Sequence, residues 1–268
     1  MNRIDKKFSG LRKRGEKAFI AYITAGYPNL PATEKIIHIL EDAGVDIIEL
    51  GMPFSDPMAD GLTIQRASEH SLRQGTTLKK VLKLVSRVRK KSAIPLVLMS
   101  YLNPVYNYGV RKFIDEAALA GLDGAIFPDL PPEEAGMFRE VIKRRDFCLI
   151  FLASSASTPH RWKAIARASR GFVYYISLMG VTGARQKLPP DIYENVKRIK
   201  RITTKPVCVG FGVSNPRQAG KVADVADGVI VGSAIVNEIS GGLGKKGGAR
   251  LNKFVSAMTK AVKKRKPR

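Results

Sequence analysis

Two carboxylates are the first candidates for chemistry in this chain of 268 residues. Glu49 lies inside the apolar run Ile47–Leu50, where burial of an unpaired carboxylate is costly and raises its pKa. A glutamate of that kind can act as a general acid or base near neutral pH, and the alternative is a structural glutamate paired with a buried cation. Asp60 follows in the turn-rich loop 51–61 and could reach the same pocket, although an Asp-Gly pair is often only a turn.

Glycine-rich segments form a second candidate feature. They follow three late apolar runs, at Gly180–Ala184, Gly210–Ser214 and Gly232–Ala234. Glycine lets the backbone approach an anion closely, and backbone amides together with the start of a short helix at Ser233 can bind a phosphate. With the two acids, this pattern favours general acid and base catalysis on a phosphate-bearing substrate.

The sequence has few residues in an arrangement suited to nucleophilic or metal chemistry. His38 and His70 fall in helical segments and His160 opens one, without a carboxylate cluster at ligand spacing, so no metal site is expected. Cys148 and Cys208 lie in apolar runs without metal-type spacing and are expected to be buried thiols in a reducing cytoplasm. No lysine stands at the end of a predicted strand, which argues against a Schiff-base mechanism.

Eight short apolar runs predict strands, each followed by a turn signal and a longer segment of helical period. Runs that are apolar throughout are typical of parallel strands covered by helices. In a barrel built this way, the active site lies at the carboxyl ends of the strands. The predicted strands are Ala18–Thr24, Ile47–Leu50, Leu96–Tyr101, Gly124–Pro128, Cys148–Ala153, Phe172–Ser177, Val207–Gly210 and Gly228–Val231.

Eight such units favour an α/β fold, a single (β/α)8 TIM barrel with extra helices, as one domain over the whole chain. Thr158 and Asn215, each before a proline, are expected helix N-caps. An open doubly wound sheet is less favoured, because no G-x-G-x-x-G segment follows the first run. Residues 240–248 are expected to form a loop before a final helix from about Leu251 to Lys263, and the basic end 263–268 is expected to fray.

The chain is strongly basic, with 46 Lys and Arg against 23 Asp and Glu and a net charge of +23. Within residues 79–91 the cations alternate with apolar residues at helical spacing, which is typical of a solvated helix face. The alternatives are non-specific attraction of polyanions, an acidic partner surface and steering of an anionic substrate, so a nucleic-acid role is not expected. No run reaches the roughly 20 apolar residues of a membrane span, and residues 18–25 are interpreted as a strand rather than part of a signal peptide.

The run Asp46–Gly61 closely resembles the characteristic motif of tryptophan synthase alpha subunits, which is long and specific. The resemblance covers nearly the whole chain. It continues through Tyr22–Pro28, Met99–Pro104, Gly180–Arg185, Gly210–Ser214 and Gly232–Val236.

This resemblance implies a lyase that splits indole-3-glycerol phosphate into indole and glyceraldehyde 3-phosphate. Asp60, ionised, would hydrogen-bond the indole nitrogen, and Glu49 would protonate the indole carbon and take the proton from the glycerol hydroxyl. The loop 182–188 would close over the substrate and exclude water. By the same resemblance, Tyr22, Ile64, Met99, Tyr101, Ile126, Phe127, Tyr174, Thr182 and Phe211 would contact the substrate, and Gly183, Gly212, Gly232 and Ser233 would hold its phosphate.

The resemblance also implies a partner. In that family the alpha chain needs no cofactor and joins a beta subunit that contains pyridoxal phosphate and receives indole through a tunnel, in a heterotetramer of two alpha and two beta chains. Interface residues would include Asp56 and the segments Asn103–Asn107 and Pro128–Pro131. The high positive charge and the lysine-rich tail depart from the family's pattern and bear on affinity for the beta subunit.

Two other functions remain open at this stage. One is a free-standing indole-3-glycerol phosphate lyase that releases indole without a partner. The other is a weakly catalytic barrel that mainly activates a beta subunit or binds a polyanion. The presence of both Glu49 and Asp60 favours an active enzyme, and activity with and without a beta subunit would separate the three.

Overall fold

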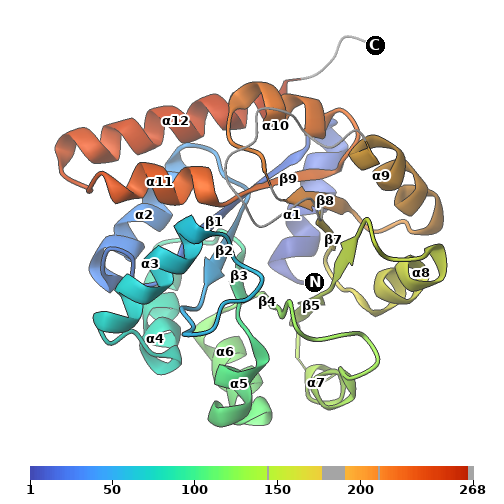
Figure 1. Ribbon diagram of the computed structural model, residues 1–268, viewed down its shortest axis with the longest axis horizontal. Helices are drawn as coiled ribbons and strands as arrows, with labels where there is room; N and C mark the ends of the chain where they lie inside the picture. The colour runs from blue at the N-terminus through green and yellow to red at the C-terminus, as the bar shows by residue number, and fades with distance from the viewer. Residues whose placement is uncertain (144, 177–190, 211, 265–268) are drawn as a thin grey trace.

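The computed structural model describes residues 1–143, 145–176, 191–210 and 212–264. Over these residues, nine parallel strands form a nearly closed barrel inside a ring of helices (Figure 1), which confirms the predicted TIM barrel. The strands follow the order β5-β4-β3-β2-β1-β9-β8-β7-β6. They are β1 (Ala18–Thr24), β2 (Ile47–Gly51), β3 (Leu96–Met99), β4 (Gly124–Ile126), β5 (Cys148–Ile150), β6 (Leu152–Ser154), β7 (Val173–Ile176), β8 (Val207–Gly210) and β9 (Gly228–Val231).

The helices cover the outside of the barrel, except for α1, which lies across one end of it (Figure 1). They are α1 (Arg3–Arg14), α2 (Leu30–Asp42), α3 (Leu62–Arg73), α4 (Leu78–Arg89), α5 (Leu102–Tyr108), α6 (Val110–Ala120), α7 (Gly136–Ile142), α8 (Pro159–Ala168), α9 (Asp191–Ile202), α10 (Pro216–Ala223), α11 (Ser233–Ser240) and α12 (Lys245–Lys263). The predicted caps are present, since Thr158 accepts a hydrogen bond from Arg161 N at 3.2 Å and Asn215 from Gln218 N at 3.0 Å.

The fifth predicted strand is divided in two, which corrects the sequence-based expectation of one continuous strand. Its first part, β5, pairs with β4, and its second part, β6, pairs with β7. Between them the amide of Phe151 donates to the hydroxyl of Ser169 at 3.2 Å. The ladder is interrupted there, so one short stretch of chain changes partner and joins the two ends of the sheet.

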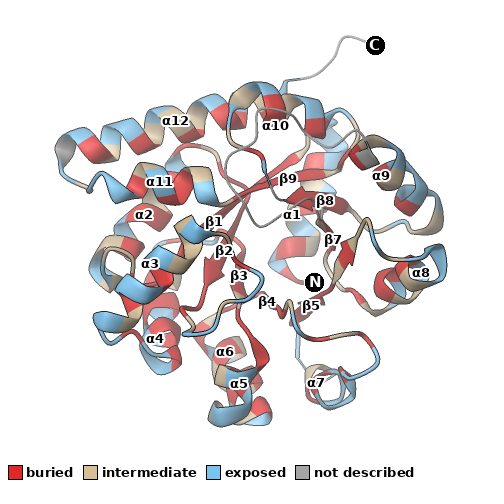
Figure 2. Ribbon diagram, in the orientation of Figure 1, coloured by how far each residue is buried: buried red, intermediate tan, exposed pale blue. Residues whose placement is uncertain are grey.

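Side chains alternate between the barrel interior and the helix layer along every strand, as the period of two requires. In β2, Ile47 joins the interior cluster and Ile48 and Leu50 join the outer one. Both faces of the strands are buried, and the outer helices are buried toward the barrel and exposed on the other side (Figure 2). The continuously apolar runs of the sequence therefore correspond to strands covered on both faces.

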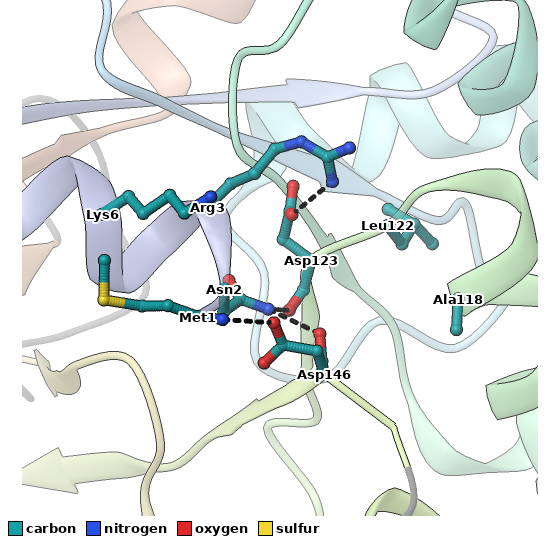
Figure 3. A pocket seen from close by; sticks show the side chains of 8 residues that line it. All are labelled: Met1, Asn2, Arg3, Lys6, Ala118, Leu122, Asp123 and Asp146. Atoms are coloured by element: carbon teal, nitrogen blue, oxygen red, sulfur yellow. Dashed lines mark hydrogen bonds and ion pairs between the residues drawn. The ribbon is translucent and has the colours of Figure 1, made fainter.

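The helix α1 closes the barrel at the amino ends of the strands, and the sequence patterns do not predict it. Ile4, Phe8 and Leu11 pack on the interior cluster, with the rings of Phe8 and Phe172 5.8 Å apart. Asn2 caps the helix by accepting from Ile4 N at 2.9 Å, and its amide donates to the carbonyls of Asp123 and Asp146 (Figure 3). The opposite face of α1 is basic and exposed. In the sequence, only the three apolar residues mark the face that packs on the barrel.

Asp123 anchors this closed end, and we expect its loss to be costly. Its side chain is 2% exposed, pairs with Arg89 at 2.7 Å and Arg3 at 2.9 Å, and accepts from Leu96 N. Replacing it by Asn leaves the largely buried Arg89 without its counter-charge, so Asp123→Asn should lower the free energy of unfolding by about 3 kcal/mol in urea titrations. As a control, Asp115→Asn disrupts an exposed pair with Arg145 and should cost less than about 1 kcal/mol. Equal losses would contradict this account.

The last helix begins earlier than predicted. α12 starts at Lys245, so the expected loop 240–248 is confined to residues 241–244 and the prediction of a helix from about Leu251 was wrong at its start. The error comes from Gly247, because glycine disfavours a helix interior. A side chain at Gly247 would clash with the carbonyl of Gly242, so the glycine permits a close approach of two chain segments.

The basic face of α4 is a solvated helix face, as predicted. The six cations of residues 79–91 other than Arg89 are exposed, and Val81, Leu84 and Val88 on the opposite side are buried. Arg87 pairs with Glu34 at 2.9 Å. Within the described part of the chain, no helix is long and apolar enough to cross a membrane.

Candidate active site

Glu49 lies inside the barrel with no hydrogen-bonding partner among the described residues. In register with Tyr22 on β1 and Val97 on β3, it faces the interior because its neighbours Ile48 and Leu50 face the helices. It is 1% exposed, and both of its carboxylate oxygens are unpaired in the described part of the chain. Burial, and then the charge of nearby Asp60, raise the pKa of Glu49 to about 8. At neutral pH it is therefore mainly a carboxylic acid, and the alternative of a glutamate paired with a buried cation finds no cation there among the described residues.

Asp60 stands at the end of the loop that links β2 to α3. It is 8% exposed, and burial raises its pKa to about 6, an effect partly offset by a hydrogen bond from the Tyr101 hydroxyl. Asp60 is thus mainly ionised at neutral pH, whereas Glu49 is mainly protonated. Two carboxyl groups with pKa values held apart are the usual arrangement for an acid and a base in one site.

Two tyrosines line the interior next to Glu49. A side chain at Gly51 would clash with Tyr22, and one at Gly210 would lie 2.5 Å from the ring of Tyr174, so each tyrosine packs closely against a glycine at a strand end. Burial raises the pKa of both tyrosines, with further contributions from the nearby acids, so both hydroxyls stay neutral. Glycine at these two positions leaves room for the two aromatic side chains that the family resemblance places in the pocket wall.

Apolar side chains complete this wall around Tyr22. Ile64 of α3 and Met99 at the end of β3 pack against a small cluster of Tyr22, Ala67 and Val236. Met99 also contacts the interior cluster that contains Ile126. Three of the residues expected in the pocket, Tyr22, Met99 and Ile126, therefore lie toward the carboxyl ends of β1, β3 and β4, and Ile64 reaches the cluster of Tyr22 from α3.

Phe127 lies on the other side of the wall, which corrects its predicted place in the pocket. Its ring is 6.2 Å from Phe113 of α6 and 5.0 Å from Phe138 of α7. Successive side chains of a strand point to opposite faces, so the interior position belongs to its neighbour Ile126 and not to Phe127.

The glycine-rich ends of β8 and β9 lie side by side, because these strands pair. Gly232 precedes the first residue of α11, Ser233, which is exposed, and the helix N-terminus has no side-chain cap. Gly212 has a φ of +77° and open space where a side chain would be. Amides at a helix start beside an open glycine turn can bind an anion. Thr182, Gly183 and Phe211, also predicted site residues, lie outside the described residues.

The expected partner-binding residues gather at this same end of the barrel. Asp56 is exposed in the loop before Asp60, and the ring of Phe54 in that loop lies 5.2 Å from Tyr101. The first amide of α5, at Leu102, donates to both carboxylate oxygens of Asp129, at 3.1 and 3.0 Å. Through Tyr101 and Leu102, these contacts bring the loop 52–61 and the segment Pro128–Pro131 next to the start of α5, the helix that contains Asn103–Asn107.

Other chemistry finds little support among the described residues. No group of three or more His, Cys, Asp and Glu side chains could hold a metal ion, and Cys148 and Cys208 are free, buried thiols, as predicted. A cavity of about 360 Å³ near α1 is lined by Met1, Arg3, Lys6 and Asp146, among others, and lies at the closed end of the barrel (Figure 3). Its charged groups include the pairs that anchor α1 and belong to the fold.

Gln65 is a contact of the site that the sequence does not single out. Its side-chain amide donates to the carbonyl of Asp60 at 2.8 Å. A glutamine in the first turns of a helix has no pattern that separates this role from simple solvent exposure, so only the folded loop shows it.

A barrel that buries a protonated and an ionised carboxyl group at the carboxyl ends of its strands is a TIM-barrel enzyme equipped for general acid and base catalysis. Residues 8–263 match the family described as tryptophan synthase alpha chain, and the chain belongs to this family. It is 48% identical to the tryptophan synthase alpha chain of Geotalea daltonii over 98% of this chain and 99% of the relative. The alpha chain of Geotalea uraniireducens is 49% identical over 98% of each chain.

Solved structures agree. The chain superposes with a TM-score of 0.90 on a structure of Mycobacterium tuberculosis tryptophan synthase, with 40% identity over 98% of each chain. It superposes with a TM-score of 0.89 on the tryptophan synthase alpha chain of Legionella pneumophila, with 38% identity over 98% of this chain and 97% of the other. Family and fold are therefore shown over nearly the full length.

Proposed function

We propose that this chain is a carbon–carbon lyase of tryptophan biosynthesis that cleaves indole-3-glycerol phosphate into indole and glyceraldehyde 3-phosphate. The observation that carries the proposal is the pair of buried carboxyl groups in opposite protonation states, Glu49 and Asp60, inside a family member. Cleavage of this substrate needs one group that gives and takes a proton and one that stabilises positive charge on the indole ring.

The protonation states of the two acids, together with the family resemblance, support the following division of their roles. Glu49, as the acid, protonates the ring carbon that carries the glycerol chain, and the positive charge that develops on the indole nitrogen is stabilised by ionised Asp60. Glu49, now a carboxylate, takes the proton of the adjacent glycerol hydroxyl. The carbon–carbon bond then breaks, its electrons return to the indole ring, and the former alcohol becomes the aldehyde of glyceraldehyde 3-phosphate.

The surrounding residues are assigned by position. The interior wall supports a pocket for the indole ring, and the ends of β8 and β9 support a phosphate site about the start of α11. Closure by the loop 182–188, with Thr182, Gly183 and Phe211 in contact with the substrate, remains a prediction from the resemblance. We assign to the wall Tyr22, Ile64, Met99, Tyr101, Ile126 and Tyr174, and to the phosphate site Gly212, Gly232 and Ser233.

A beta subunit is the proposed partner, in an assembly of two alpha and two beta chains. Support comes from family membership and from the surface joined by Asp56, Asn103–Asn107 and Pro128–Pro131 beside the site. In this assembly pyridoxal phosphate belongs to the beta subunit, and this chain works without a cofactor. A cytoplasmic location stays a prediction from the two cysteines.

The test is steady-state indole release from indole-3-glycerol phosphate by the purified chain, alone and with a beta subunit. We expect slow release by the chain alone and faster release with the partner. Equally fast release without the partner would favour a free-standing lyase. No release in either mixture, from a chain with the circular dichroism of a folded barrel, would contradict the enzymatic proposal.

A further inference from the structure

The loop 52–61 carries Asp60 at its far end and is held there by two side chains from outside it. On one side, the amide of Gln65 in α3 donates to the carbonyl of Asp60 at 2.8 Å. On the other, the hydroxyl of Tyr101, just after β3, accepts from the amide of Ala59 at 2.9 Å. The two bonds thus fix the backbone immediately before and at the acid.

Among the described residues, few other contacts hold this part of the loop. The amides of Met58 and Asp60 donate to carbonyls of the loop itself, at Asp56 and Pro57. Met58 is 88% exposed, and the N-cap of α3, Gly61, has no side chain with which to fix the turn. Within the described part of the chain, the position of Asp60 therefore depends on side chains that reach it from α3 and from the end of β3.

We propose that Gln65 is a positioning residue for the lyase reaction, acting with Tyr101 as a two-point clamp that holds Asp60 over the substrate pocket. This inference rests on the catalytic role proposed for Asp60. A carboxylate must lie within hydrogen-bonding distance of the indole nitrogen to stabilise its charge, and a displacement of about 1 Å can cost up to about 10²-fold in rate. Gln65 acts on Asp60 through the backbone carbonyl.

The second clamp residue, Tyr101, also interacts with the carboxylate of Asp60. The charge of Asp60 acts on Tyr22 of β1, Glu49 of β2, Tyr174 of β7 and Tyr101, and the charge of Asp129 also acts on Tyr101. The hydrogen bond from Tyr101 lowers the pKa of Asp60 against the effect of burial. Tyr101→Phe should therefore move the acidic limb of the kcat/KM profile to higher pH, whereas a change at Gln65 should leave that limb in place.

The experiment compares Gln65→Met, which keeps the side-chain length and removes the donor, with Gln74→Met, a matched change at the exposed end of the same helix. We expect kcat for indole release to fall about tenfold in Gln65→Met, with KM within about twofold of wild type, and to stay unchanged in Gln74→Met. Both variants should unfold within about 2 °C of wild type, because one half-buried hydrogen bond is exchanged for apolar contact.

A double-mutant cycle separates positioning from a general structural effect. If the clamp acts through the Asp60 carboxylate, adding Gln65→Met to Asp60→Asn should lower kcat by less than about twofold further. A tenfold loss in both backgrounds, or no loss in Gln65→Met alone, would overturn the proposed clamp. Full activity of Asp60→Asn would instead contradict the proposed role of Asp60, so the two failures are distinguishable.

Discussion

Glu49→Gln is expected to lower kcat for indole release by about 10²- to 10⁴-fold, the usual range for loss of a general acid and base. The amide has the shape of the carboxylic acid but cannot pass a proton to the indole ring and recover it from the glycerol hydroxyl. Because Glu49 is buried without a hydrogen-bond partner among the described residues, the change removes no hydrogen bond that these residues make. Binding of indole-3-glycerol phosphate, measured by calorimetry, should stay within about fivefold of wild type.

The pH dependence of wild-type activity should report the ionisation of the same two groups. The pKa of Asp60 is raised to about 6 and that of Glu49 to about 8, each mainly by burial. Activity needs Asp60 ionised and Glu49 protonated, so kcat/KM should fall below about pH 6 and above about pH 8. The two acids interact, so the limbs belong to the pair. A profile flat from pH 5 to 9 would argue against both assignments.

The free energy of unfolding provides the control for Glu49→Gln, because the change that reduces activity should make the protein more stable at high pH. A pKa raised from 4.5 to about 8 means that folding favours the protonated acid. This contribution is complete below pH 4.5 and is lost as the pH rises to about 8, because over this range the unfolded chain releases the proton of Glu49 while the folded chain keeps it. Between pH 5 and pH 9, wild type should therefore lose about 2–4 kcal/mol of unfolding free energy more than Glu49→Gln. An inactive variant that is also less stable at pH 9 would indicate misfolding.

Asp60→Asn is expected to lower kcat by about 10²- to 10³-fold, because the amide keeps the shape but removes the negative charge that stabilises the developing cation on the indole nitrogen. The acidic limb near pH 6 should disappear with it. The measurement is kcat and kcat/KM for indole release by the chain alone, so that the partner surface has no influence.

Asp56→Asn is the matched control for this second prediction. Asp56 lies in the same loop but is exposed, and its carboxylate accepts a hydrogen bond from neighbouring Ser55. Removing that charge should leave kcat of the isolated chain within about twofold of wild type. If both changes reduced kcat equally, the loss would come from the loop as a whole, and Asp60 would have no special part in the reaction.

Much of the barrel could be predicted because its strands are buried on both faces and so form apolar runs in the sequence. An acid inside such a run, at Glu49, is rare and costly enough that the sequence by itself indicates a function for it. The role of Asp60 could not be predicted in this way, because a loop of turns has no period that orients its side chains. The role of Asp60 was predicted from the resemblance to a family and not from the spacing of residues.

The remaining differences arise where contacts between distant segments decide the outcome. Three apolar residues of α1 close the barrel, but nothing local distinguishes them from a basic terminal segment. Phe127 and Ile126 are adjacent and equally apolar, and only the register of β4 decides which of them faces the interior. By itself, Gly247 disfavours a helix. Its close approach to Gly242 explains why a glycine occupies this position inside α12.

Because the closed end and the active site lie at opposite ends of the barrel, substitutions at the two ends should have different consequences. Substitutions among Asn2, Arg89 and Asp123 act far from the carboxyl groups, so they should reduce how much folded protein a cell accumulates while each surviving molecule keeps its turnover rate. Substitutions around the loop 52–61 should do the reverse and leave abundance unchanged. A screen that measures protein level and growth without tryptophan in the same cells would assign these two classes to opposite ends of one barrel.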